Sequence, residues 1–223
     1  AYKQCMFQRI NPVSRPVRDE DIVAVDANGT FVTGFSNADT LKEYIGSMFP
    51  LLSFLEGRIA EHQLQTGDVS SMQQFMYYYW SKKNPLDPEA GWRSYRAEVA
   101  KVNANYSTRS QKGYETERGR VYLKYGPPNT IVKDYQDPES YPYEIWHYYR
   151  LGSQTNRRFV FYSTDISNNS FRLLHSDARG EIQDINWELK LHSRSQAFGA
   201  DIDQEKAYDI YGSRTKENFS LPR

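Results

Sequence analysis

The spacing of apolar residues changes once along this chain, from the period of a helix to the alternation of a strand. Between residues 40 and 106, apolar side chains recur three or four positions apart. The clearest such stripe is Met72, Phe75, Met76, Tyr79 and Trp80. Residues 143–149, 158–163 and 171–175 instead alternate or form short runs rich in aromatic and β-branched side chains. This order predicts an α+β fold, with an N-terminal helical segment (about residues 40–106) packed on a mainly antiparallel β-sheet (about residues 118–191).

Local signals place the ends of several of these elements. Thr40 with Glu43, and Ser53 with Glu56, match the capping box that begins a helix. Arg120–Tyr125 alternates between apolar and polar side chains and is therefore predicted to be a strand. We expect this strand to stop at Gly126, Pro127 and Pro128, because proline cannot donate to a β-ladder.

Three regions are expected along the chain. Residues 1–35 are predicted to be an extended arm and a β-hairpin, with Asn28-Gly29 as its turn, left over from a preceding β-domain. Residues 36–195 form the α+β domain, and residues 196–223 a polar C-terminal tail.

Composition excludes several classes of protein. The 28 basic residues balance the 28 acidic ones, so the chain lacks the basic surplus of a general nucleic-acid binder. No apolar stretch approaches the roughly 20 residues that span a bilayer, so we do not expect the chain to cross a membrane. The single cysteine, Cys5, cannot form a disulfide within the chain.

Motifs for catalysis and cofactor binding are missing from the sequence. The four histidines share no HxH, HxxxH or HExxH spacing, and neither GxSxG nor GxGxxG occurs. We therefore expect no metal, no cofactor and no catalytic residues, and a protein that is not an enzyme.

One stretch carries a family resemblance. Residues 113–128 read Gly-Tyr-Glu-Thr-Glu-Arg-Gly-Arg-Val-Tyr-Leu-Lys-Tyr-Gly-Pro-Pro, and Tyr143-Glu144-Ile145-Trp146 follows. This resembles the GWxTD domain family of bacterial envelope proteins, best represented in Bacteroidota. The positions that keep the family pattern are Gly113, Thr116, Arg118, Gly119, Arg120, Gly126, Pro127 and Pro128. Tyr114 stands where the family usually has Trp, and Glu117 where it has Asp.

The resemblance implies an exported protein, in the periplasm or associated with the outer membrane. It implies a non-catalytic interaction or structural module, whose partners are other envelope proteins in a secretion, motility or outer-membrane assembly complex. On this basis the family motif, together with Glu144 and Trp146, is the expected interface.

Two questions stay open at this level. The charged residues Thr116, Glu117, Arg118 and Arg120 either form an interface or make internal ion pairs, from Glu117 to Arg120 or from Glu144 to an arginine.

The alternative function is a carbohydrate-binding or carbohydrate-active domain. Its carboxylates and rings would be Glu115, Glu117, Asp134, Glu139 and Glu144 with Tyr135, Tyr141, Tyr143 and Trp146. Solvent exposure separates the two functions, since exposed rings favour sugar, whereas an apolar centre with a polar rim favours protein.

Overall fold

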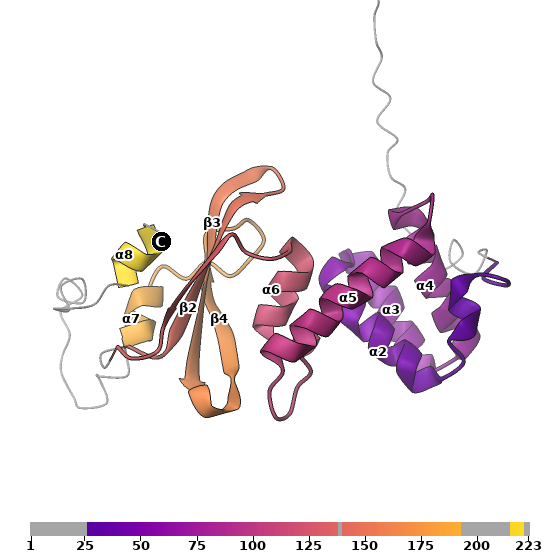
Figure 1. Ribbon diagram of the computed structural model, residues 1–223, viewed down its shortest axis with the longest axis horizontal. Coiled ribbons are helices and arrows are strands. Elements are labelled where there is room, and N and C mark those ends of the chain that lie inside the picture. The colour runs from indigo at the N-terminus through magenta and orange to yellow at the C-terminus, as the bar shows by residue number, and fades with distance from the viewer. Residues whose placement is uncertain (1–25, 138–139, 193–214, 221–223) are drawn as a thin grey trace, which may run out of the picture. The chain divides into compact units, whose positions relative to one another are not determined.

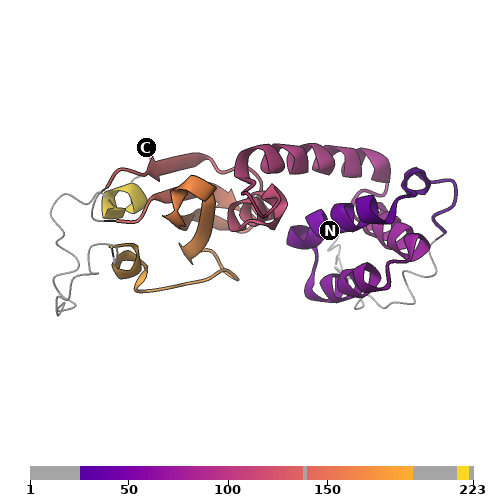
Figure 2. The ribbon, with the colours of Figure 1, turned by 90° about the horizontal axis from the view of Figure 1, so that it is seen from below.

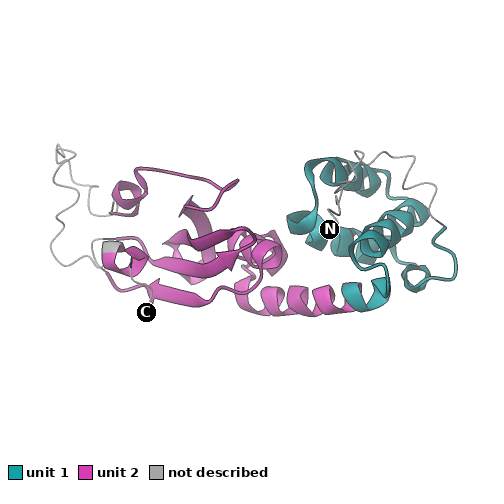
Figure 3. Cartoon of the chain, turned by 90° about the horizontal axis from the view of Figure 1, so that it is seen from above, with its two compact units in different colours: residues 1–91 teal, residues 92–223 magenta. Residues whose placement is uncertain are grey.

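The computed structural model describes residues 26–137, 140–192 and 215–220 (Figure 1). It divides into two compact units, residues 1–91 (unit 1) and 92–223 (unit 2), coloured separately in Figure 3. Helices occupy the N-terminal part and an antiparallel sheet the C-terminal part, which confirms the α+β class. The boundaries expected at residues 35 and 195 stay a prediction.

The described part of unit 1 is helical. Its elements are η1 (Phe31–Gly34), α2 (Ala38–Met48), η2 (Phe49–Leu51), α3 (Phe54–Thr66) and α4 (Val69–Lys83). Helix α4 packs against both α2 and α3. All five residues of the predicted stripe in α4 are buried, as a helix with one apolar face requires.

Helix starts in unit 1 follow side-chain caps. The predicted capping box at Ser53 and Glu56 is confirmed at the start of α3. The box predicted at Thr40 is wrong: α2 begins at Ala38, because the side chain of Asn37 accepts hydrogen bonds from the backbone of Asp39 and Thr40. Asparagine is among the strongest N-cap residues, so Asn37 places the N-cap three positions before Thr40.

The hairpin predicted around Asn28-Gly29 is also wrong where the structure describes it. Gly29 does adopt a positive φ of 71° in a turn. Residues 31–34 then form the 3₁₀ helix η1, whose N–H groups bond three residues back, with Val32 fully buried. Residues 22–25, the other half of the expected hairpin, lie outside the described residues.

Unit 2 joins helices to a four-stranded sheet. Helix α5 (Pro88–Tyr106) begins in unit 1 and continues into unit 2. The elements that follow are η3 (Gly113–Glu115), α6 (Glu117–Tyr125), β1 (Thr130–Asp134), β2 (Tyr143–Leu151), β3 (Gln154–Asp165), η4 (Ile166–Asn168), β4 (Ser170–Ser176), α7 (Trp187–Leu191) and α8 (Thr215–Ser220). The strands lie in the order β1-β2-β3-β4, and every neighbouring pair is antiparallel.

Both faces of the sheet are covered, as Figures 1 and 2 show. One face packs against α6 and the end of α5 through Val121, Trp146, Tyr148, Leu151, Phe159, Phe161, Phe171, Leu173 and Ala178. The other packs against α7 and α8 through Tyr143, Ile145, Val160, Leu174, Trp187 and Leu191, with Phe219 at its border. Alternation along β2 therefore places apolar residues in two cores, which explains its nearly continuous burial.

The strand predicted at Arg120–Tyr125 is a helix instead, α6. Arg118, Val121, Tyr122 and Tyr125 lie at i, i+3, i+4 and i+7, and this stripe faces the sheet. Its first member is an arginine, so a count of apolar residues registers only the other three members of the stripe.

The sheet consequently begins at Thr130 rather than near residue 118. Its first strand, β1, is half exposed, with side chains that alternate between intermediate and exposed. The predicted sheet also ran to residue 191, but its last segment forms α7.

Candidate functional site

The family motif forms a tight corner between α5 and α6. A Cβ atom on Gly113 would lie 2.2 Å from the carbonyl oxygen of Val102 in α5. A Cβ atom on Gly119 would lie 1.9 Å from the carbonyl oxygen of Gly113 and 2.8 Å from Cγ1 of Val102. Glycine is thus required at both positions, because only a residue without a side chain permits this approach.

Thr116 holds the corner from inside. Its hydroxyl donates to the carbonyl of Gly113 at 2.7 Å and accepts from the N–H of Gly119 at 3.1 Å, which makes Thr116 the N-cap of α6. The N–H of Tyr114 donates to Oδ1 of Asn103 in α5 at 3.2 Å, which joins the motif to the preceding helix.

Arg118 and Glu144 form a buried ion pair between α6 and β2. Nη1 of Arg118 lies 2.9 Å from Oε1 of Glu144, and their side chains are only 4% and 2% exposed. The carboxylate also accepts hydrogen bonds from the indole N–H of Trp146, at 2.9 Å, and from the hydroxyl of Tyr135. An internal pair from Glu144 to an arginine was one of the two alternatives that the sequence left open, and it is present.

The guanidinium of Arg118 also has partners in the turn before β4. Nη2 donates to the carbonyl oxygen of Asn169 at 2.8 Å and to its side-chain oxygen at 2.5 Å. The same group lies 4.1 Å from the centre of the Phe171 ring, a distance typical of a cation–π contact. The guanidinium of Arg118 therefore stabilises the fold through internal contacts and does not serve an external ligand.

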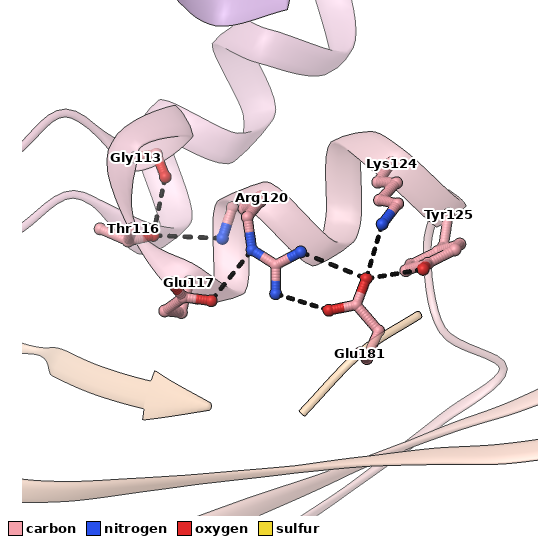
Figure 4. Close-up of polar contacts among 8 residues, drawn as sticks. Gly113, Thr116, Glu117, Arg120, Lys124, Tyr125 and Glu181 are labelled. Atoms are coloured by element: carbon pink, nitrogen blue, oxygen red, sulfur yellow. Dashed lines mark hydrogen bonds and ion pairs between the residues drawn. The ribbon is translucent and has the colours of Figure 1, made fainter. Parts of the chain in front are cut away.

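Arg120 lies at the centre of a second charge network, at the surface of α6 (Figure 4). Its Nε donates to Glu117 at 3.0 Å, and its two terminal nitrogens donate to Glu181 at 3.3 and 2.8 Å. Lys124 and Tyr125 each donate to the same carboxylate at 2.7 Å. Arg120 thus forms ion pairs with two carboxylates of unit 2, those of Glu117 and Glu181.

Glu181 is the member of this network that sequence reasoning missed. Burial raises the pKa of its carboxyl, but the hydrogen bonds from Arg120, Lys124 and Tyr125 outweigh that effect and lower the pKa to about 2. The available signal was Glu117, Arg120 and Lys124, which line one side of α6 at i, i+3 and i+7. Such spacing marks a charged helix face, but the alternation of Arg120–Tyr125 predicts a strand there.

Gly126, Pro127 and Pro128 end α6 instead of a strand. Gly126 has φ 85° and ψ −176°, a region that is open essentially to glycine alone. Its carbonyl accepts a hydrogen bond from the hydroxyl of Tyr148 at 2.9 Å, which attaches the end of the helix to β2.

A pocket of about 370 Å³ opens beside the motif. Its walls come from Thr108 and Gln111 before the corner, from residues 115–117 within it, and from residues 170–173 of β4 together with Ile182. Most of the exposed lining is polar and includes the carboxylates of Glu115 and Glu117, which we assign to the rim. Phe171 and Leu173, both buried, contribute to the smaller apolar part, which we call the floor. We call this feature the motif pocket.

Comparison with known families places the chain. The family model described as the GWxTD domain matches residues 40–185. The chain belongs to the GWxTD domain family. Comparisons with curated proteins and with solved structures returned no match. The corner shows what the GWxTD motif does here: its glycine and threonine shape the turn, and its last position, Glu117, binds Arg120.

The rings proposed for sugar stacking are largely withdrawn from solvent. Tyr143 and Trp146 are fully buried, one on each face of the sheet. Tyr135 is 37% exposed, but its hydroxyl donates to Glu144. Glu139 lies outside the described residues. Exposure therefore weighs against an aromatic platform formed by this set.

The residues that the structure describes contain neither a candidate metal site nor a candidate membrane span. No group of three His, Cys, Asp or Glu side chains there is placed to hold a metal ion. In the same part of the chain, no helix combines the length and the apolar character that crossing a membrane requires.

Proposed function

We propose that this GWxTD domain is a non-catalytic protein–protein interaction module of a bacterial cell-envelope complex. The observation that carries the proposal is the motif pocket, which combines an apolar floor with a polar, charged rim. Protein interfaces typically have this anatomy, with a buried apolar centre surrounded by polar groups.

The charged residues around the pocket fall into two groups, the arginines that stabilise the corner and the carboxylates that a partner can contact. Arg118 and Arg120 are both held by partners within unit 2, which leaves them to stabilise the corner. Glu115 and Glu117 line the pocket from the same corner, so a partner can contact the family motif through these two carboxylates. The envelope location, in the periplasm or at the outer membrane, follows from the family resemblance and forms part of the proposal.

Affinity purification of the native protein in gentle detergent, with mass spectrometry, tests this function. Gln111→Trp fills the motif pocket. The turn is retained, because only backbone groups of Gln111 close it: its carbonyl accepts from the N–H of Thr108, and its N–H donates to the hydroxyl of Thr108. Gln136→Trp is the matched control, because Gln136 is also an exposed loop glutamine of unit 2 but does not line the pocket.

We expect an envelope protein to co-purify in stoichiometric amount with the wild type and with Gln136→Trp, and to be lost with Gln111→Trp. A wild-type protein that emerges alone, even after crosslinking in intact cells, would refute the proposal. Glycan-binding assays would then test the alternative.

A further inference from the structure

Strand β4 is an edge of the sheet. It pairs with β3 on one side, and the described chain has no strand on the other. On that outer side, the backbone bond described is from the N–H of Ser176 to the carbonyl of Ile182, at one end of the strand. Backbone groups along an open edge can pair with a further strand.

The motif pocket runs along this edge rather than over a face of the sheet. Four consecutive residues of β4, Ser170 to Leu173, line it. Successive side chains of a strand point to opposite faces, so a pocket on one face would be lined by alternate residues. Consecutive lining residues indicate that the pocket follows the backbone of the strand edge.

The wall opposite β4 is acidic. Glu115 is exposed, and one of its oxygens accepts the backbone N–H of Lys112. The side chain of Glu117 is 44% exposed, and one of its carboxylate oxygens accepts a hydrogen bond from Arg120. The guanidinium of Arg120 also donates to Glu181. The pair of carboxylates therefore keeps oxygens with which a cationic side chain can bond.

The one basic residue among the lining residues points elsewhere. Arg172 lies between Phe171 and Leu173, which both belong to the core under α6. Alternation directs Arg172 to the opposite face of the sheet, where its register partner Tyr162 borders the second core. The α6 side of the pocket thus offers carboxylates beside an apolar floor.

We propose that the outer edge of β4 binds an extended segment of a partner protein as a fifth strand, with a lysine or arginine of that segment against Glu115 and Glu117. This inference rests on the proposed function and names the form of partner that it requires. Main-chain hydrogen bonds to the edge supply affinity in strand addition, and pockets for side chains supply specificity. The apolar floor of Phe171 and Leu173 suits an apolar neighbour of the basic residue.

A phage-displayed library of random ten-residue peptides is the probe, selected on the immobilised full chain and counter-selected on Gln111→Trp. We expect the enriched peptides to carry a lysine or arginine among alternating apolar residues. A synthetic copy should slow hydrogen exchange of the amides in residues 170–173, and methylation of its alternate backbone nitrogens should abolish binding.

Charge is tested by Glu115→Gln, which removes the charge but can still accept the N–H of Lys112. We expect this variant to weaken binding of the peptide about two- to fivefold, as loss of one exposed ion pair implies. Glu61→Gln, the same change at an exposed position of α3 outside the pocket, should leave binding unchanged.

Three results would overturn strand addition. The first is enrichment of peptides without a basic residue, and the second is protection of amides outside β4. The third is a stable dimer in light scattering whose residues 170–173 are protected, which would assign the edge to a second copy of the chain. If an envelope protein still co-purifies, these results leave the proposed function standing, whereas a protein that purifies alone refutes the function itself.

Discussion

Replacing Arg118 by methionine should severely destabilise unit 2. The substitution keeps an unbranched side chain of similar length but leaves the carboxylate of Glu144, 2% exposed, without its cationic partner. Trp146 and Tyr135 still donate to that carboxylate, but both are neutral. Breaking a buried ion pair on one side costs about 3–5 kcal/mol, because an uncompensated charge stays in the interior. We expect the free energy of unfolding to fall by about that amount.

The double variant Arg118→Met with Glu144→Gln isolates the charge from the packing. Glutamine keeps an oxygen that can accept from Trp146, so the double variant should be more stable than Arg118→Met alone by about 1–2 kcal/mol. Urea unfolding at pH 7, followed by near-ultraviolet circular dichroism, measures both. A loss below about 1 kcal/mol for Arg118→Met, or a double variant as unstable as the sum of the single ones, would refute this reasoning.

Three further outcomes are expected. Gly113→Ala should cost about 3 kcal/mol or more, since its Cβ would lie 2.2 Å from the carbonyl of Val102, whereas Gly57→Ala, with no atom within 4 Å, should be neutral or stabilising in thermal unfolding. The pKa of Glu181 is lowered from 4.5 to about 2, so its contribution of up to about 3 kcal/mol is present above pH 4.5 and is lost as the pH falls toward 2; Glu181→Gln should remove that slope from stability measured against pH. Burial, followed by the charge of Arg158, lowers the pKa of His147 below 6.5, so stability is lost as the pH falls below 6.5; His147→Phe should reduce this loss in the urea midpoint, while His175, whose pKa burial also lowers, maintains part of it.

The helices were the most predictable part of the molecule. The α4 stripe and the box at Ser53 depend on residues close in sequence, which is why the sequence alone determines them. The capping-box pattern does not identify Asn37, because this cap consists of the side chain of a single residue.

The sequence pattern predicts the wrong secondary structure where tertiary contacts determine it. Arg120–Tyr125 has the alternation of a strand, but burial of Arg118 against Glu144 fixes a helix there. Strand β1 has a weak pattern because it is a half-exposed edge. In the candidate site, the family residues were identified from sequence, but Glu181, 61 residues from Arg120, has no local signal that links it to the motif.

Asn169 gives the motif an unusual dependence on the order of folding. Its side chain donates to the carbonyls of Asn105 and Ser107 at the end of α5, and it accepts from Arg118. These contacts close loops of 64, 62 and 51 residues, so the entropy of loop closure must be overcome before they form. The corner therefore completes its contacts only after the β3–β4 hairpin has emerged from the ribosome. A nascent chain that ends at residue 165 already carries the entire motif but not Asn169, which joins Arg118 of the motif to the end of α5.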